Sequence, residues 1–235
     1  MRQVDGRSML HHLVARRSVW WPTNRGWAAL FFLVMIPMAT WFFLGEGFLA
    51  RNRPLPAEAL IIEGWIGIEG VRAARIEFDQ GHYRYLVTTG ELTDNRWGPQ
   101  RWNYAIEAYE LLHRLGVPDD RLIAAPAPET ERQRTFTSAA AARDELRHRG
   151  IQIRSANVFT LGAHARRSRL VFAKALPGVD VGVIAWHPPT FTSGPWWRSS
   201  ERAEEFLKET AGYFYELIFN SGRLSNSSSP APTKP

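Results

Sequence analysis

Short apolar runs alternate with amphipathic segments from residue 59 to residue 219 of this chain. The apolar runs are rich in β-branched residues, as in Ala59–Glu63 (ALIIE), and are too short for helices, so they predict buried strands. The segments between them repeat apolar residues every three or four positions, which predicts helices. We expect strands at 59–63, 85–89, 121–125, 156–161 and 180–185, and helices at 69–80, 101–115, 135–148, 166–176 and 200–219.

This alternation predicts an α/β fold. Strands that alternate with helices over short connections form parallel βαβ units, with helices on both faces of the sheet. We therefore expect a Rossmann-like, three-layer αβα domain over residues 59–220, with a mainly parallel sheet of about five strands. Residues 50–58 are expected to form a linker, and the Ser-, Pro- and Asn-rich residues 221–235 a disordered tail. The last helix is expected to bury Phe206, Thr210, Tyr213, Phe214 and Leu217.

One long uncharged stretch near the N-terminus interrupts this pattern. Residues 27–44 read WAALFFLVMIPMATWFFL, which is apolar enough and long enough to cross a bilayer. We expect a transmembrane helix over residues 27–49, with tryptophans near both ends, as is typical of membrane interfaces. The alternatives are a cleaved signal peptide, although no clear small-residue cleavage site follows, and a buried helix of a soluble protein.

Charge indicates how this helix is oriented. The formal net charge is +6, and residues 1–26 contain five arginines and one aspartate. The positive-inside rule places this basic arm in the cytoplasm and the residues from about 50 onward outside. The rest of the chain is nearly balanced in charge and has no nucleic-acid-binding motif, so nucleic acid is not an expected partner. The absence of cysteine excludes disulfides, thiol nucleophiles and cysteine-ligated metals.

Polar side chains follow several of the expected strands. The carboxyl ends of parallel strands lie at one edge of a sheet, where ligands bind in open α/β folds. Arginine side chains and helix N-termini at such an edge bind phosphate or carboxylate groups. The pattern predicts a pocket for an anionic ligand; the alternative is that the arginines form ordinary ion pairs with nearby glutamates. The expected ligand-binding residues are Gly64, Thr89, Gly90, Arg134, Thr135, Ser138, Arg166 and Arg167.

Two titratable residues are candidates for proton transfer. His164 follows the strand at 156–161 and Gly162, and the ordinary pKa of histidine lies near neutrality. Glu63 ends a buried strand, where a carboxylate is costly unless it is paired or used. We interpret both as candidate catalytic residues, with a structural hydrogen-bonding role as the alternative. The chain has no phosphate-loop, dinucleotide, nucleophile-elbow or zinc-helix motif and no convincing metal-ligand spacing, so no metal is expected and the cofactor is left unknown.

These features resemble the YdcF/SanA/ElyC-like family of bacterial envelope proteins, a domain of unknown function. The likeness extends from about Ala59 to Phe219. The family has glycines at two strand ends, a Gly-Val-Pro turn, an Asn-Thr helix start and a His-x-x-Arg element. The corresponding residues here are Glu63-Gly64, Thr89-Gly90, Gly116-Val117-Pro118, Arg134-Thr135 through Ser138, and His164-Ala165-Arg166-Arg167. The sequence Glu-Gly-Trp in place of a glycine-rich first loop, and Arg134 in place of asparagine, indicate a divergent branch.

The resemblance implies a Rossmann-like fold and a role in envelope or peptidoglycan biogenesis. Together with the apolar segment and the basic arm before it, the resemblance leads us to expect a location in the bacterial inner (plasma) membrane, with the α/β domain in the periplasm. Fold alone does not decide whether the protein is an enzyme, and that question stays open. The expected function is to bind an anionic small molecule or lipid-linked precursor, such as a phosphorylated lipid carrier or wall precursor. Whether the protein also transforms this ligand chemically stays open. The alternatives are a non-catalytic envelope assembly or sensing factor and a cytoplasm-facing nucleotide binder.

Overall fold

The computed structural model describes residues 21–94, 101–191 and 194–219. It contains two compact units, residues 1–43 and 44–235, and each is considered by itself. Most of the expected basic arm and the whole of the expected disordered tail lie outside the described residues.

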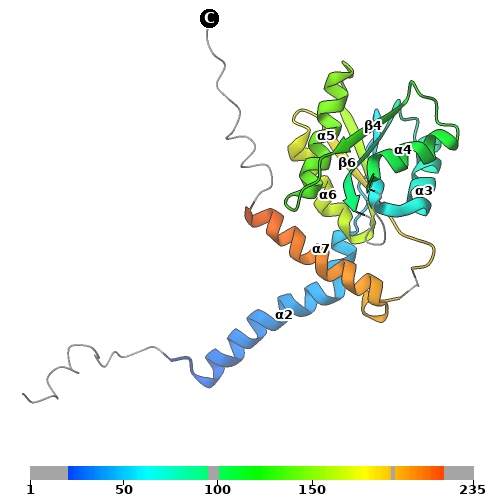
Figure 1. The fold of residues 1–235 in the computed structure, drawn as a ribbon. Helices are drawn as coiled ribbons and strands as arrows, with labels where there is room; N and C mark the ends of the chain where they lie inside the picture. The colour runs from blue at the N-terminus through cyan, green and yellow to red at the C-terminus, as the bar shows by residue number, and fades with distance from the viewer. Residues whose placement is uncertain (1–20, 95–100, 192–193, 220–235) are drawn as a thin grey trace, which may run out of the picture. The chain divides into compact units, whose positions relative to one another are not determined.

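Helix α2 (Asn24–Leu49) contains the long apolar stretch (Figure 1). Within the described part of the chain it is the one helix long and apolar enough to cross a membrane. Its apolar side chains are exposed, for example Val34 at 55% and Ile36 at 61%. Only 6% of its most apolar 18-residue window is buried, which favours a membrane span over a helix buried in a soluble core.

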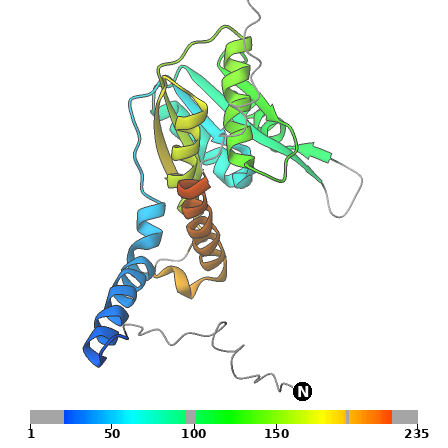
Figure 2. The same ribbon diagram turned by 90° about the vertical axis from the view of Figure 1, so that its left-hand side faces the viewer.

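The second unit contains a mixed, mostly parallel sheet, which confirms the predicted α/β class. Its parallel strands follow the order β4-β2-β1-β5-β6. A short sixth strand, β3, pairs antiparallel with the far end of β2, beyond the part that β1 covers (Figure 2). The bounds are β1 (Ala59–Glu63), β2 (Tyr85–Asp94), β3 (Arg101–Asn103), β4 (Leu122–Ala127), β5 (Ser155–Leu161) and β6 (Asp180–Trp186).

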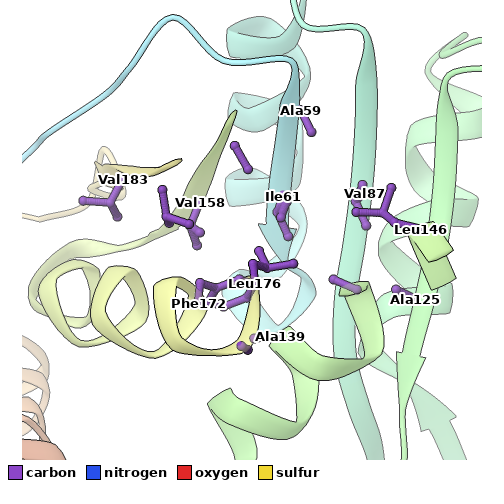
Figure 3. Close-up of a cluster of buried hydrophobic side chains, with 14 of the residues drawn as sticks. Ala59, Ile61, Val87, Ala125, Ala139, Leu146, Val158, Phe172, Leu176 and Val183 are labelled. Atoms are coloured by element: carbon purple, nitrogen blue, oxygen red, sulfur yellow. The ribbon is translucent and has the colours of Figure 1, made fainter. Parts of the chain in front are cut away.

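Helices pack on both faces of this sheet. Helices α3 (Gly67–Gln80) and α4 (Tyr104–Arg114) cover one face, and α5 (Arg134–His148) and α6 (Ala165–Ala175) cover the other (Figure 1). The α5/α6 side encloses a cluster of fully buried aliphatic and aromatic side chains (Figure 3). It includes Ile61, Val87, Val158 and Phe172, each 0% exposed. Ala59 and Ile61, two positions apart on β1, both belong to this cluster because side chains along a strand alternate between its two sides.

Most elements match their predicted bounds within two residues, but the segment around residue 101 does not. We expected a helix over 101–115; residues 101–103 form β3, and α4 begins at Tyr104. The Asn103 side chain explains the boundary, because its oxygen accepts hydrogen bonds from the backbone N–H groups of Ala105 (2.9 Å) and Ile106 (3.4 Å) and caps the helix. Strand β2 also runs past its expected end at Thr89, since β3 pairs with the extension.

The last helix, α7 (Ser200–Phe219), has the predicted bounds but not the predicted buried face. Phe206 is buried as expected, whereas Phe214 and Leu217 are 44% and 53% exposed. Two carboxylates, Glu209 and Glu216, are buried on α7. Their partners lie elsewhere in the fold and belong to the candidate site.

Candidate functional site

A cavity of about 440 Å³ lies at the carboxyl edge of the sheet. Its walls come from the ends of β1 and β2, the first turn of α5, the segment after β5, and one side of α7. β1 and β5 are neighbours, but β1 is followed by β2 on one side of the pair and β5 by β6 on the other. Open α/β sheets bind ligands at the carboxyl edge where the strand order reverses in this way. Seven expected site residues line the cavity: Glu63, Gly90, Arg134, Thr135, Ser138, His164 and Arg167.

Three expected residues, Gly64, Thr89 and Arg166, are not among the lining residues. A Cβ atom at Gly64 would lie 2.3 Å from the carbonyl oxygen of Tyr104, so this glycine lets the end of β1 approach α4. Thr89 is fully buried and donates its hydroxyl to the carbonyl of Ile62 at 3.2 Å. Arg166 lines a different cavity.

A buried network of charged side chains forms the floor of the first cavity. The His164 ring is 4% exposed, and its Nε2 lies 3.3 Å from each carboxylate oxygen of Glu63. Its Nδ1 lies 3.0 Å from Glu209 Oε2. Arg167 donates to both oxygens of Glu209, at 2.7 and 3.0 Å, in the bidentate geometry typical of strong arginine–carboxylate pairs. Ser168 donates its hydroxyl to Glu63 at 2.7 Å.

The two carboxylates hold His164 in its charged form. Burial alone would lower the pKa of His164, but the charges of Glu209 and Glu63 outweigh it and raise the pKa to about 9, against the opposing effect of Arg167. Burial alone would raise the pKa of Glu63 and of Glu209. In both residues the charge and hydrogen bonds of His164 outweigh burial, so each pKa lies below its ordinary value. At neutral pH His164 is therefore a proton donor rather than an acceptor.

Loss of that proton would change the partner of Nδ1. The atom lies 3.0 Å from Glu209 Oε2 and 2.9 Å from Arg167 Nη2. When Nδ1 carries a hydrogen it donates to Glu209. In the neutral tautomer with the hydrogen on Nε2, Nδ1 accepts from Arg167. The site thus offers His164 a hydrogen bond in both protonation states, but the charges balance only when the ring is protonated.

A tight turn positions His164 at the end of β5. Gly162 has φ +27°, and a Cβ atom there would lie 2.5 Å from Glu205 Oε1. The same Glu205 oxygen accepts a hydrogen bond of 2.6 Å from the backbone N–H of Ala163. The Trp65 ring packs edge-on against the imidazole, with ring centroids 5.0 Å apart. Glycine at 162 and a carboxylate from α7 therefore fix the turn that presents His164.

The first turn of α5 lines the other side of the cavity through Gln133, Arg134 and Thr135. The side chain of its N-cap residue, Gln133, makes no capping hydrogen bond to this helix, and the first turn contains no acidic residue. The N-terminal backbone N–H groups of a helix lack partners within the helix and favour anions. Gln133 adopts a left-handed conformation, with φ +55°, where the chain enters the helix.

Arg134 stands at the mouth of the cavity with a side chain that is 61% exposed, and it forms an ion pair with Glu91. This is one of the arginine–glutamate pairs that the alternative interpretation expected. The other carboxylate oxygen of Glu91, Oε2, is buried and receives no hydrogen bond from the described protein groups. A buried acceptor of this kind costs about 1–3 kcal/mol while it has no donor.

The contribution of α7 to the cavity was not predicted from the sequence. Glu209, Gly212 and Glu216 lie on one face of α7, because residues three, four and seven apart share a helix face. Glu216 is paired with Lys174 of α6 at 2.5 Å. One sequence signal could have predicted this contribution: glutamates recur at 209 and 216 on the helix face that carries the buried Phe206. Across the described segments, no group of three or more His, Cys, Asp or Glu side chains is arranged to hold a metal ion.

A scan against protein-family models and a search of the curated proteins found no match to this chain. Membership of the YdcF/SanA/ElyC-like family therefore stays a prediction based on the motifs.

Proposed function

We propose that this chain is a single-pass membrane protein whose extracytoplasmic domain binds an anionic, phosphate- or carboxylate-bearing metabolite of the bacterial cell envelope. The observation that carries the proposal is the first turn of α5, which has no capping hydrogen bond from its N-cap side chain and lines the cavity together with Arg134 and Arg167. Guanidinium groups and helix N-termini are the two protein features best suited to phosphate and carboxylate oxygens. The strand order and the helices on both faces support a Rossmann-like, three-layer fold, in which this edge is the usual ligand site.

The glutamates of the cavity do not oppose this assignment. The buried ones each have a cationic partner: Glu63 has His164, Glu209 has Arg167, Glu216 has Lys174 and Glu91 has Arg134. At these four buried positions an arriving anion therefore meets neutralised pairs rather than bare carboxylates.

Glu91 indicates a second chemical group that the ligand should carry, a hydrogen-bond donor. Its Oε2 atom is a buried acceptor without a protein donor and belongs to a residue that lines the cavity. A ligand with a hydroxyl group beside its anionic group would donate to this atom and recover the cost of its burial. Hydroxyl-bearing phosphates, such as sugar phosphates, combine both groups.

The anchor in this proposal is α2. The helix has the length and composition of a membrane span, and the five arginines before residue 27 favour a cytoplasmic N-terminus. The domain after α2 would then lie in the periplasm, beside the inner membrane.

If the bound metabolite is transformed, we propose that His164 acts as the acid and that Glu63 acts as its carboxylate partner. The charged ring has a proton to give, and its carboxylate partners would stabilise it again after reprotonation.

The second candidate function is a non-catalytic envelope assembly or sensing factor. It is favoured by the same geometry, since both ring nitrogens of His164 are engaged by protein groups and the ring is 4% exposed. This candidate expects His164→Gln and Glu63→Gln to be tolerated in cells while deletion of residues 1–43 is not. The enzymatic candidate expects both substitutions to abolish function even where the protein remains folded.

A thermal-shift titration tests the binding proposal. Full-length protein in detergent is titrated with glucose 1-phosphate, glucose and inorganic phosphate. A ligand selective for the folded state raises the Tm by mass action. The test variant is Glu91→Gln/Arg134→Gln, which removes the ion pair without leaving either charge alone, and the control is Arg147→Gln on the exposed end of α5.

We expect glucose 1-phosphate to raise the Tm of the parent and of Arg147→Gln, and to lose its effect on the double variant. Equal Tm shifts in all three proteins, or no Tm shift from glucose 1-phosphate or inorganic phosphate, would contradict the proposed anion site.

A further inference from the structure

A second cavity, of about 350 Å³, is lined by arginines. Arg51, Arg53, Arg166 and Arg169 contribute to its wall, and no acidic residue does so among the described residues. None of the four is within ion-pair distance of a carboxylate in the described ranges 21–94, 101–191 and 194–219. Burial and the neighbouring charges of Arg53 and Arg166 lower the pKa of Arg169. A cluster of like charges with no internal counter-ion is electrostatically incomplete, and an anion would complete it.

Two of these arginines are held in fixed positions. The Arg166 guanidinium lies 3.6 Å from the centroid of the Phe48 ring, and its Nε donates to the hydroxyl of Tyr213 at 3.3 Å. Arg169 Nε donates to the carbonyl of Val181 at 2.9 Å. A guanidinium has five N–H donors, so these contacts orient the group and leave donors for a ligand.

The cavity also lies close to the end of α2. Arg51 and Arg53 are the second and fourth residues after Leu49, where α2 ends. A chain spans at most about 3.6 Å per residue, which places the two arginines within roughly 7 and 14 Å of the helix end. If α2 crosses a bilayer, this distance corresponds to the headgroup layer.

Helix α7 provides the apolar part of the same surface. Tyr213 and Leu217 line the arginine cavity. Beside them, Leu207, Phe214 and Ile218 share one helix face and are 60%, 44% and 69% exposed. An exposed apolar helix face next to a cationic cluster is typical of helices that lie in a membrane interface.

We propose that the cavity formed by Arg51, Arg53, Arg166 and Arg169 binds the phosphate headgroup of an anionic membrane lipid, with the outer face of α7 against the bilayer. The proposal rests on the proposed function in one respect, the use of α2 as the membrane anchor. It does not depend on the ligand of the first cavity. Phosphate and guanidinium form bidentate hydrogen bonds, and the α7 face selects a lipid rather than a soluble phosphate as their source.

The lipid site is tested by mass spectrometry of the intact full-length protein in detergent, titrated with phosphatidylglycerol, phosphatidylcholine or glycerol phosphate. The test variant is Arg51→Gln/Arg53→Gln, because both side chains are exposed. The control, Arg114→Gln/Arg147→Gln, removes the same charge from exposed positions elsewhere.

We expect phosphatidylglycerol to bind more tightly than phosphatidylcholine, and the test variant to weaken its binding roughly 30-fold, the value for two arginines near an anionic surface. If the control variant lost as much affinity for phosphatidylglycerol as the test variant, the effect would come from net charge alone, and the proposed site would be overturned. Binding of glycerol phosphate as tight as that of phosphatidylglycerol would overturn the lipid as the source.

Single cysteines test the bilayer contact separately from the anchor. The chain has no cysteine, so a fluorophore attached at Val34→Cys, Phe214→Cys or Glu201→Cys reports one position in full-length protein in vesicles with spin-labelled lipids. Quenching at positions 34 and 214 but not 201 is the expected result. Quenching at 34 without 214 would overturn the α7 contact and leave the anchor intact, whereas no quenching at 34 would overturn the anchor and this inference with it.

Discussion

The charged ring of His164 makes the stability of the protein depend on pH. Its pKa is 6.5 in an unfolded chain and about 9 in the folded one, because Glu209 and Glu63 outweigh the opposing effects of burial and Arg167. A group with a higher pKa in the folded state stabilises that state fully below the unfolded pKa, here about 6.5, and this stability is lost as the pH rises through about 9. At about 1.4 kcal/mol for each pKa unit, the contribution is roughly 3 kcal/mol. Solvent screening does not reduce it much, since the ring is 4% exposed.

The assay compares the Tm of the parent and of His164→Gln in detergent from about pH 6 to about pH 10 at constant ionic strength. A change of 1 kcal/mol shifts the Tm of a domain of this size by roughly 2–4 °C. The parent should therefore lose roughly 6–12 °C more than the variant over this range. The difference between the two proteins removes the contribution of titrating groups outside the network of His164, Glu63 and Glu209, since the pKa of these two carboxyls itself depends on the His164 charge. Curves of equal slope would refute the view that Glu209 and Glu63 hold a proton on His164.

Two further predictions concern packing. Gly212→Ala places a Cβ atom 2.9 Å from Arg167 Nε, so the guanidinium must move from Glu209, and we expect a loss of about 1–3 kcal/mol in the free energy of unfolding, measured by urea denaturation. Gly47→Ala is the control, since nothing lies within 4 Å of the added atom, and an equal loss there would contradict the steric reason. Phe172→Ala empties a site that is 0% exposed and should cost about 3–5 kcal/mol, whereas Phe172→Met should cost much less; similar costs for the two would show that the core does not depend on filling this volume.

The local pattern of the sequence was sufficient to predict the strands and helices because each buries an apolar face against its neighbours. Ala59–Glu63 is fully buried along its length, and its continuous apolar run predicted both the element and its bounds. Strand β3 was missed because three residues are too few for any periodicity. Its backbone conformation depends on pairing with β2 and on the cap at Asn103, neither of which is visible in a hydrophobic pattern.

The site was partly predictable for a geometric reason. Glu63 and His164 are 101 positions apart, yet the rule that parallel strands end at one edge brought them together in the prediction, and their side chains are 3.3 Å apart in the structure. Glu209 was beyond that rule, because it belongs to no strand end. A glutamate on a helix normally indicates a solvated face, and only the contacts with His164 and Arg167, both far away in the sequence, make its burial favourable.

Helices α6 and α7 connect the two cavities. Arg166 and Arg167 are adjacent on α6, but Arg166 lines the arginine cavity and Arg167 the first cavity. On α7, Glu209 holds Arg167 while Tyr213, one turn later, holds Arg166. A displacement of α7 by a lipid in the arginine cavity would therefore move the carboxylate that keeps His164 charged. Because coupling between two binding sites is reciprocal, an anion in the first cavity would change lipid affinity by the same factor. If both cavities bind their ligands as proposed, this pair of arginines is the physical route by which the lipid and the anion would affect each other's binding.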